Sequence, residues 1–396
     1  MNTAVAKSLL VAPPDPKPAA SQTMVEVARR FGVGPLRQFR EMAALRWGPG
    51  KLDSHEYFST RAFDPALSAA QKRTLVGKIG SYELNVAASP MKLTGTRAFL
   101  RDKVMYTALL QQLGFATTET QAVTHRHRMF GSIPTLRTPD DIETFLRGPA
   151  RYPLFAKPCE GAGSVGSALI MGRDGDLLVM TNGRRVDVGG FAREVMEEYP
   201  EGCLLQSAIE QHPAMSDMTG QAVGTLRVVT LRDENGIAPL YTVWKVPSPK
   251  AMSDNFWQSG SMVALIDDDS GQVRQCNIGS GLSAEWVERH PVSGLTFEGS
   301  QIPHWGAVRD VATQAHGLFP EFGLVGWDIA VGPDGPIIIE SNDNPYHVLR
   351  QLAAGEGIRN PRFLPRFEAA AAASDMMLKE RVATFRDRQA AKAGKN

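Results

Sequence analysis

The fold of this chain can be inferred from one stretch, Gly326-Trp327-Asp328-Ile329-Ala330-Val331-Gly332-Pro333-Asp334-Gly335-Pro336-Ile337-Ile338-Ile339-Glu340-Ser341-Asn342. Two apolar runs flank a Pro-Asp-Gly turn, which predicts a hairpin whose three-residue loop pairs Gly332 with Pro336. In that register Asp328 stands opposite Glu340, and Asn342 shares the face of Glu340 because side chains alternate along a strand. Two carboxylates and an amide oxygen suit a hard cation such as Mg²⁺. The alternative is a solvated hairpin whose polar residues face water.

Length and composition indicate an ordinary globular protein. The 396 residues, 43% hydrophobic and 21% charged, are enough for one large core or two to three modest ones. A net charge of +1 argues against nucleic acid or a membrane surface as the main partner, although a local basic pocket for phosphates is still allowed. The cysteines, Cys159, Cys203 and Cys276, are odd in number and widely spaced, so they predict no disulfide framework and favour a reducing cytoplasm. No apolar run reaches a membrane-spanning length.

The order of apolar patterns predicts an α+β protein with a helical beginning and end. A proline-rich tail precedes mostly helical sequence, and a helix is expected from Thr94 to Leu113. Short apolar runs then alternate with turns up to Ser207, and a strand-rich region follows. The predicted divisions are a flexible tail (1–22), a helical N-terminal region (23–95), a first α+β subdomain (96–207), a second α+β subdomain (208–350) and a C-terminal helix (351–396).

A glycine-rich loop follows one predicted strand. Phe155-Ala156-Lys157-Pro158 ends the strand, and Glu160-Gly161-Ala162-Gly163-Ser164-Val165-Gly166-Ser167 can bring backbone N–H groups against phosphate oxygens. This is not a P-loop, because the lysine precedes the glycines and no Gly-Lys-Ser/Thr follows them. Taken alone, the loop is weak evidence for phosphate binding and is more often a structural turn, and Lys103 taken alone is a solvated helix lysine.

Two cations lie inside predicted strands. Arg227 interrupts the apolar run Thr225 to Leu231, where it is either an edge or ion-pair residue or a fixed planar cation for developing negative charge. Lys245 could meet Arg227 across the hairpin face, and its role is open. Asn255 and Gln258 lie in a polar loop that needs no function beyond connection.

The order of these features resembles the working parts of the ATP-grasp superfamily. Lys103, Lys157 with its loop, Gln206-Ser207-Ala208-Ile209, Arg227, and Asp328 with Glu340 and Asn342 follow one another as they do in that superfamily. The segment from Lys157 to Gly166 looks like the phosphate loop of D-alanine-D-alanine ligases. The chain is similar, more closely, to the sugar-transfer associated ATP-grasp group through several short motifs: Asp254-Asn255, Gly260, His290-Pro291, Ile302-Pro303-His304-Trp305 and Gly326-Trp327-Asp328.

The resemblance implies an ATP-grasp fold in which residues 96–207 form a lid subdomain and residues 208–350 a core subdomain that together hold the nucleotide. ATP and Mg²⁺ or Mn²⁺ are the implied cofactors. It implies that Arg227 and Lys245 are catalytic, that Asn255 and His290 bind substrate, and that Asp328, Glu340 and Asn342 bind the metal. The implied ATP-binding residues are Lys103, Lys157, Gly161, Gly163, Ser164, Val165, Gly166, Gln206, Ser207, Ile209 and, as a candidate for the ribose, Glu210.

The activity that the resemblance implies is an ATP-dependent ligase that activates a carboxylate as an acyl phosphate for attack by an amine. A kinase acting on a sugar or polyol hydroxyl is an alternative, with Asp254 or His290 as its base, and a nucleotide-sensing scaffold without turnover is another. The expected partners are small-molecule carboxylates and amines, without nucleic acid or membrane insertion. A homodimer is left open.

Overall fold

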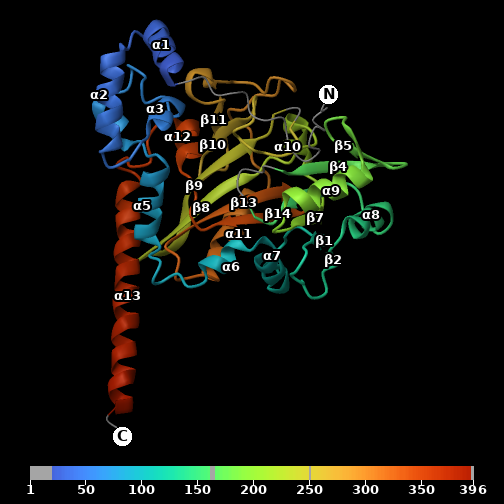
Figure 1. Ribbon diagram of the computed structural model, residues 1–396. Helices are drawn as coiled ribbons and strands as arrows, with labels where there is room; N and C mark the ends of the chain where they lie inside the picture. The colour runs from blue at the N-terminus through green and yellow to red at the C-terminus, as the bar shows by residue number, and fades with distance from the viewer. Residues whose placement is uncertain (1–19, 161–165, 249–250, 394–396) are drawn as a thin grey trace.

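Two seven-stranded sheets form the framework of the molecule (Figure 1). The computed structural model describes residues 20–160, 166–248 and 251–393. The order of the first sheet is β2-β1-β7-β3-β4-β5-β6, and its strands are antiparallel neighbours except for the parallel pair β1 and β2. Its strands are β1 (Thr120–Thr124), β2 (Thr135–Leu136), β3 (Leu154–Pro158), β4 (Ala168–Asp174), β5 (Leu177–Met180), β6 (Arg185–Asp187) and β7 (Cys203–Ser207).

Two helices close the apolar face of the first sheet, α8 (Pro139–Arg147) and α9 (Val188–Glu198). Phe145 of α8 and Phe191 of α9 join one buried cluster with strand residues such as Leu154 and Leu205. Pro139 at the first turn and the Thr138 side chain, which accepts a hydrogen bond from the N–H of Asp141, explain where α8 begins. The region from 120 to 207 therefore has a core of its own.

The second sheet has the order β12-β11-β10-β9-β8-β13-β14 and is antiparallel throughout. Its central strands are buried on both faces, which explains why β13 reads as a continuous apolar run. Helix α11 (Trp305–Gly317) shares a core with one face. The strands are β8 (Leu226–Asp233), β9 (Gly236–Val246), β10 (Met262–Ile266), β11 (Val273–Ile278), β12 (Glu285–Trp286), β13 (Leu324–Gly332) and β14 (Gly335–Asn342).

Helices from both ends of the chain cover the other face of the second sheet. α5 (Lys78–Ala88) packs against α13 (Leu364–Ala393), and Leu84 and Phe367 from these helices join one cluster with Val229 and Tyr241. α12 (Val348–Ala354) packs beside them on β9 and β10. The C-terminal half of α13 extends away from the rest of the molecule (Figure 1).

The remaining helices lie mainly at the N-terminal end. α1 (Ala20–Phe31), α2 (Pro35–Arg46) and α3 (Ser54–Ser59) share a small separate core that includes Tyr57 and Phe63, and α4 (Ala69–Thr74) follows. α10 (Pro213–Thr219) connects the two sheets. Both sheets carry helices and mostly antiparallel strands, so the predicted α+β class is confirmed. Within the described residues, no helix combines the length and the apolar character that crossing a membrane requires.

The single helix predicted from Thr94 to Leu113 is wrong, because the segment forms two helices, α6 (Arg97–Arg101) and α7 (Lys103–Gln112). Asp102 separates them with an extended backbone, and its side chain accepts hydrogen bonds from the N–H groups of Val104 and Met105. The apolar stripe continues across this break, so periodicity alone did not reveal it. An aspartate whose short side chain can accept hydrogen bonds from the first N–H groups of a helix is nonetheless a signal for a helix start.

The predicted hairpin between β13 and β14 is correct at its open end and wrong at its turn. Asp328 pairs with Glu340 as expected, but Gly332 pairs with Gly335 rather than with Pro336. A bulge between Asp328 and Ile329 shifts the register by one residue and restores the expected pairing toward Asn342. The turn error and the bulge cancel, which is why the carboxylates still face each other.

Candidate functional site

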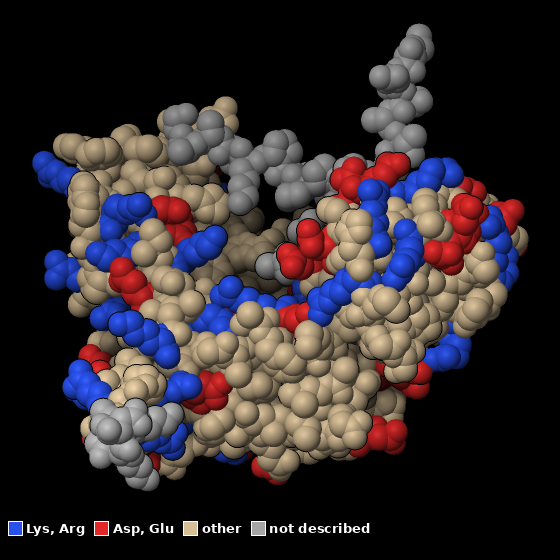
Figure 2. Space-filling view, turned by 60° about the horizontal axis from the view of Figure 1, so that its bottom comes forward, with Lys and Arg blue, Asp and Glu red and all other residues tan. Residues whose placement is uncertain are grey.

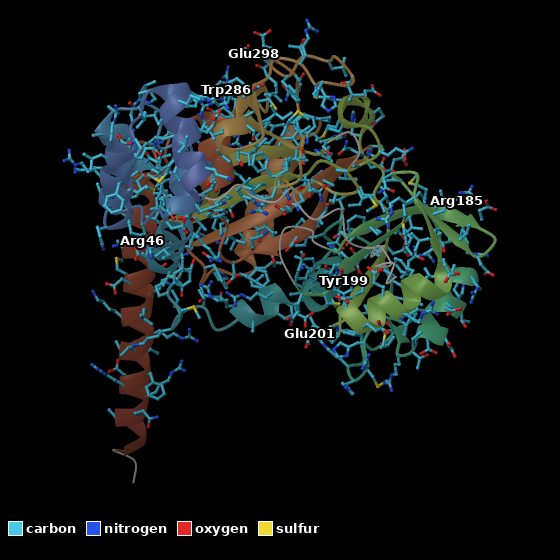
Figure 3. The ribbon with its side chains drawn as sticks, turned by 45° about the horizontal axis from the view of Figure 1, so that its top comes forward. Arg46, Arg185, Tyr199, Glu201, Trp286 and Glu298 are labelled. Atoms are coloured by element: carbon cyan, nitrogen blue, oxygen red, sulfur yellow. The ribbon has the colours of Figure 1, made fainter. Side chains whose placement is uncertain are left out.

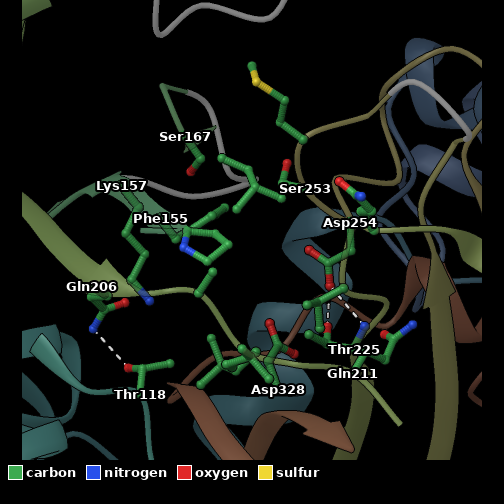
Figure 4. A pocket seen from close by; sticks show the side chains of 18 of the residues that line it. Thr118, Phe155, Lys157, Ser167, Gln206, Gln211, Thr225, Ser253, Asp254 and Asp328 are labelled. Carbon is green, nitrogen blue, oxygen red and sulfur yellow. Dashed lines mark hydrogen bonds between the residues drawn. The ribbon is translucent and has the colours of Figure 1, made fainter. Parts of the chain in front are cut away.

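A cavity of about 600 Å³ lies between the two sheets (Figure 4). The first sheet supplies residues of β3, β4 and β7, and the second supplies residues of β9, β13 and β14. The segment from Ala208 to Gln211 runs along the wall between them. Figure 2 shows the surface hollowed between two parts of the molecule, with lysine and arginine side chains along one edge of the hollow.

One part of the cavity is an apolar slot. Phe155 and Leu169 of the first sheet line it, together with Ile209 and with Ile339 of β14. Next to them, the buried Gln206 side chain donates hydrogen bonds to Thr118 (2.8 Å) and Thr120 (3.2 Å). These bonds hold the strand β7 and the segment that follows it in place, so a planar ring entering the slot would meet a pre-formed wall.

Lys157 supplies a buried cation at the end of β3 (Figure 4). Its side chain reaches the cavity and is 8% exposed, and the described residues give its ammonium group no hydrogen-bond or ion-pair partner. Burial lowers the pKa of Lys157, and the nearby Glu340 partly opposes that effect. An unpaired buried ammonium group is costly unless a ligand supplies negative charge. This position therefore favours an anion in the cavity.

Lys103 brings a second ammonium group to the same place. It is the first residue of α7, which begins where Asp102 caps the helix, and its Nζ lies 3.9 Å from Oε1 of Glu340. The Glu340 side chain, 30% exposed, thus faces Lys103 in the structure. Two lysines and one carboxylate surround the same part of the cavity.

Beside these lysines, buried charges alternate in sign along four side chains. Arg227 of β8 donates two hydrogen bonds to Asp328, one from Nε to Oδ1 and one from Nη2 to Oδ2 at 2.9 Å. Lys245 donates to the same Oδ2 at 3.1 Å and lies 2.9 Å from Oδ2 of Asp254. Thr225 donates to Asp254 from both its hydroxyl and its backbone N–H. Each buried charge therefore has a partner of opposite sign.

The pKa of Asp328 reflects this arrangement. Burial alone would raise it, but the attraction of Arg227 and Lys245 is stronger, and the pKa of Asp328 is lowered well below its usual range. For Lys245, burial would lower the pKa, and the charges of Asp254 and Asp328 raise it overall. Both groups are therefore charged at neutral pH.

The predicted metal ligands offer the oxygen atoms that Mg²⁺ prefers, and they differ in how many hydrogen bonds they already make within the protein. Asp328 and Glu340 face each other across β13 and β14, and the buried Nδ2 of Asn342 has no hydrogen-bond partner among the described residues. Glu340 is the more available carboxylate, because both oxygens of Asp328 already accept hydrogen bonds from Arg227 or Lys245. No group of three or more His, Cys, Asp and Glu side chains in the described part of the chain is arranged to hold a metal. A cation here would use two carboxylates, the amide oxygen and ligand oxygens.

Of the fourteen predicted site residues that the structure describes, nine line the cavity and five do not. Arg227 and Asn342 do not line the wall and reach it only through Asp328 and through the strand shared with Glu340. Gly161, Gly163, Ser164 and Val165 lie outside the described residues. The predicted residues that line the cavity are Lys103, Lys157, Gln206, Ser207, Ile209, Glu210, Lys245, Asp328 and Glu340.

Gly166 is described, and its place has a steric reason. Its φ is +80°, and a Cβ built on it would lie 2.2 Å from the hydroxyl oxygen of Tyr199. The close approach of Tyr199 and the left-handed backbone both require glycine. A role of Gly166 toward phosphate stays a prediction.

The two residues predicted to bind substrate do not line the cavity. Asn255 accepts a hydrogen bond from the N–H of Trp257 (3.1 Å), and buried His290 accepts one at Nδ1 from the N–H of Ser293 (3.2 Å). Both side chains thus order turns of the chain. Burial also lowers the pKa of His290. Substrate binding by Asn255 and His290 stays a prediction without a contact to the cavity.

Several cavity residues were not predicted as ligand contacts. The pattern around Leu169 and Met171 indicates only a strand, and no motif marks Gln211 or Ser253, although all four line the cavity. The sequence suggested Asp254 only as the base of a kinase, although the residue belongs to the Asp254-Asn255 motif and lines the cavity. The alternation in β4 indicates which strand residues share a face, but only the packing of the two sheets shows that this face borders a cavity.

Solved structures of similar architecture were found, each at low identity. The L-amino acid ligase from Bacillus licheniformis is 16% identical (TM-score 0.36), with 69% of this chain and 48% of that one covered. A biotin carboxylase complex from Campylobacter jejuni is 11% identical (TM-score 0.39; 69% and 46% covered), and the D-alanine-D-alanine ligase from Coxiella burnetii is 13% identical (TM-score 0.40; 74% and 62% covered). The chain spans about half the length of the first two. No curated protein matches it.

A family model matches residues 94–366, which is more than half of the chain and includes both sheets and the cavity between them. Its description is sugar-transfer associated ATP-grasp. The match also includes every residue to which the sequence assigned a site role. The chain therefore belongs to the family of sugar-transfer associated ATP-grasp proteins.

Proposed function

We propose that the protein is an ATP-dependent ligase that converts a carboxylate into an acyl phosphate and passes the acyl group to an amine. The observation that carries this proposal is the cavity in which Lys157, buried and without a described partner, lies near Lys103 and the opposed carboxylates Asp328 and Glu340. Membership of an ATP-grasp family makes ATP the ligand that fits these charges.

The adenine of ATP fits the apolar slot between Phe155, Leu169 and Ile339, with the segment after Gln206 along its edge. The phosphates would then extend toward Lys157 and Lys103. Both lysines are point charges that can follow a phosphate group as it moves. Glu340, Asn342 and Asp328 would hold Mg²⁺, which supplies neutralisation of the phosphate oxygens when it is bound.

The chemistry requires no side-chain nucleophile. A carboxylate oxygen of the substrate attacks the γ-phosphorus, the bond from this phosphorus to the β–γ bridging oxygen breaks, and ADP leaves. The amine nitrogen then attacks the acyl carbon, phosphate leaves with the bonding electron pair, and the nitrogen loses a proton. Lys103 and Lys157 would stabilise the charge on the transferred group.

Arg227 was predicted to stabilise developing charge, and its guanidinium group is occupied by Asp328. We therefore propose that Arg227 acts first as a positioning residue that fixes Asp328. Of the two cations predicted inside strands, Lys245 is the one that lines the cavity, and it also bonds Asp254 and Asp328.

One observation favours the alternative of a kinase. Asp254 lines the cavity, as a base near an acceptor hydroxyl would. Its Oδ2, however, already accepts hydrogen bonds from Thr225 and is 2.9 Å from Lys245. A carboxylate held in this way is better suited to orienting a group than to accepting its proton.

Trapping with hydroxylamine tests the proposal. The protein is incubated with Mg²⁺-ATP, hydroxylamine and a panel of carboxylates, and hydroxamate, ADP, AMP and phosphate are measured separately. A ligase gives hydroxamate with equal amounts of ADP and phosphate, because hydroxylamine replaces the amine. A phosphorylated product that accumulates without hydroxamate would instead identify a kinase.

A further inference from the structure

The outer face of α2 is apolar although it faces solvent. Leu36 is 65% exposed, Phe39 is 65% exposed, and Trp47, directly after the helix, is 80% exposed. The structure also leaves Val25 of α1 64% exposed. We refer to Leu36, Phe39 and Trp47 as the N-terminal apolar face. Large apolar side chains clustered on a surface mark a site of interaction more often than single ones do.

These residues recur at helical spacing. Leu36 and Phe39 lie on one side of α2, and Trp47, the residue that caps its C-terminal end, continues that side, since positions three and eleven residues apart share a side of a helix. The opposite side of α2 is already used, because Gln38 and Leu45 are buried against the rest of the N-terminal region. The helix thus has two apolar sides, of which the fold covers only one.

Arginines flank the N-terminal apolar face. Residues 22–50 contain five arginines, no lysine and only two acidic residues, which gives this segment a positive net charge. Glu41 binds Arg37, Lys72 and Tyr57, and Glu26 binds Arg29. The exposed Arg40 and Arg46 have no acidic partner among the described residues.

The face also lies at an outer edge of the molecule. Figure 1 shows α1 and α2 at the side opposite α8, and Figure 3 shows Arg46 on the other side of the molecule from Arg185. The cavity between the sheets is lined by residues outside α1 and α2. An exposed face of a helix, unlike that cavity, does not enclose a small molecule.

We propose that the N-terminal apolar face binds reversibly to a membrane surface that contains anionic lipids. Trp47, Phe39 and Leu36 would enter the boundary between headgroups and acyl chains, while Arg40 and Arg46 contact lipid phosphates. Aromatic rings prefer this boundary, and arginine side chains extend their charge from it toward the headgroups. The near-neutral chain as a whole gives no general attraction, so binding would depend on this face.

Vesicle co-sedimentation of the full chain tests the proposal. Vesicles of phosphatidylcholine with phosphatidylserine should bind the protein, vesicles of phosphatidylcholine alone should bind it weakly, and added salt should weaken binding. Trp47→Ala should lower the partition coefficient roughly tenfold, the equivalent of one large apolar side chain removed from the boundary. The double change Arg40→Glu with Arg46→Glu should remove the preference for the anionic vesicles.

Matched controls are available on other surfaces. Phe385 of α13 is 62% exposed, a fraction similar to that of Phe39. Arg185 is an exposed arginine at the far side of the molecule. Phe385→Ala and Arg185→Glu should leave vesicle binding unchanged. Because all these side chains are exposed, circular dichroism should show every variant folded.

Two results would overturn the proposal. One is equal vesicle binding by wild type, Trp47→Ala and the double arginine variant. The other is the absence of vesicle binding by the wild type, combined with an effect of Trp47→Ala on a different partner. That effect would be the loss of a dimer in sedimentation equilibrium or the loss of binding in a nucleic-acid titration. The face would then be an interface between copies of the chain or a nucleic-acid contact.

Discussion

At the scale of single residues, Asp328 is the centre of the site because two buried cations depend on it. Arg227 uses both Nε and Nη2 on this carboxylate, and Lys245 adds a third hydrogen bond. Breaking such a pair leaves an uncompensated buried charge, which costs more than the pair itself contributes. Stability and chemistry are therefore coupled at this residue.

Arg227→Ala is expected to lower the free energy of unfolding by roughly 3 to 5 kcal/mol, since Asp328 would lose its main partner in a buried site. Urea denaturation at neutral pH measures this loss. Adding Asp328→Ala to Arg227→Ala should recover part of it, because the orphaned carboxylate is then removed as well. A single variant within about 0.5 kcal/mol of wild type, the range of ordinary surface changes, would show that the pair is not important for stability.

Glu340→Gln is expected to abolish ADP formation while the protein stays folded. Glu340 is the carboxylate least occupied by other groups, so it would be the strongest ligand of Mg²⁺ bound with nucleotide. Coupled assay of ADP and urea denaturation measure the two effects. Asp334→Asn, at the turn of the same hairpin and outside the cavity, is the control and should retain activity. Near-normal turnover in Glu340→Gln would reject the metal assignment.

The sequence could predict the pairing of Asp328 with Glu340, because alternation along two strands carries that information. It could not predict that Arg227 and Lys245 would both be used by Asp328. That arrangement depends on β8 lying between β9 and β13 in one sheet, which only the packing of distant segments determines. The polar loop around Asn255 indicated a connecting role, whereas no pattern in the sequence indicated that His290 orders a turn.

At the scale of elements, the start of α7 positions one of the cavity lysines. Asp102→Ala removes the side chain that accepts from the N–H groups of Val104 and Met105, and it should lower the free energy of unfolding by about 1 kcal/mol. Nucleotide affinity should fall as well, because Lys103 is the first residue of the helix. Urea denaturation and nucleotide titration measure the two effects.

Two controls separate the cap from other effects of Asp102. Asp102→Asn keeps a capping oxygen but removes the ion pair with Arg128, so it should retain most of the nucleotide affinity. Ser68→Ala removes the N-cap of α4 far from the cavity and should lower stability without changing nucleotide binding. Equal loss of affinity in Asp102→Ala and Ser68→Ala would mean that the effect is general destabilisation.

Elements with strong local signals could be predicted closely. The apolar runs Leu177 to Met180 and Met262 to Ile266 predict two strands, and β5 and β10 have these bounds, since short apolar runs bounded by turns allow few alternatives. The break between α6 and α7 and the bulge in the β13–β14 hairpin were missed. Both depend on one residue whose backbone departs from its neighbours, which an averaged periodicity cannot show.

At the scale of the whole molecule, the family match confirms the ATP-grasp resemblance seen in the sequence. An ordered series of motifs spread over some 200 residues is specific because its members need not be close in sequence to share one site. The proposed division of the chain into domains stays a prediction. The N-terminal apolar face could not be predicted, because amphipathic spacing does not tell which of two apolar sides the fold covers.

His347 joins three separate parts of the molecule. Its Nδ1 is 2.8 Å from the hydroxyl of Tyr241 on β9, its Nε2 is 2.8 Å from Oδ1 of Asn85 on α5, and it directly precedes α12. Burial lowers its pKa to about 3, because the charged imidazole would lose hydration that these neutral partners do not replace. The helical N-terminal region is thus connected to the second sheet through a histidine that must stay neutral.

Stability should therefore fall as the solution is acidified, and His347 should account for part of the fall. The folded pKa lies below the unfolded value of about 6.5, so the contribution is complete above that value and is lost as the pH falls toward about 3. Within this window one such group changes the free energy of unfolding by about 1.4 kcal/mol per pH unit.

Urea denaturation of wild type at pH 7 and pH 5 should show the loss. His347→Gln should be less stable at pH 7 but lose less on acidification, whereas the exposed His127→Gln should follow wild type at both values. An equal loss in His347→Gln and wild type would show that His347 is not the group that titrates.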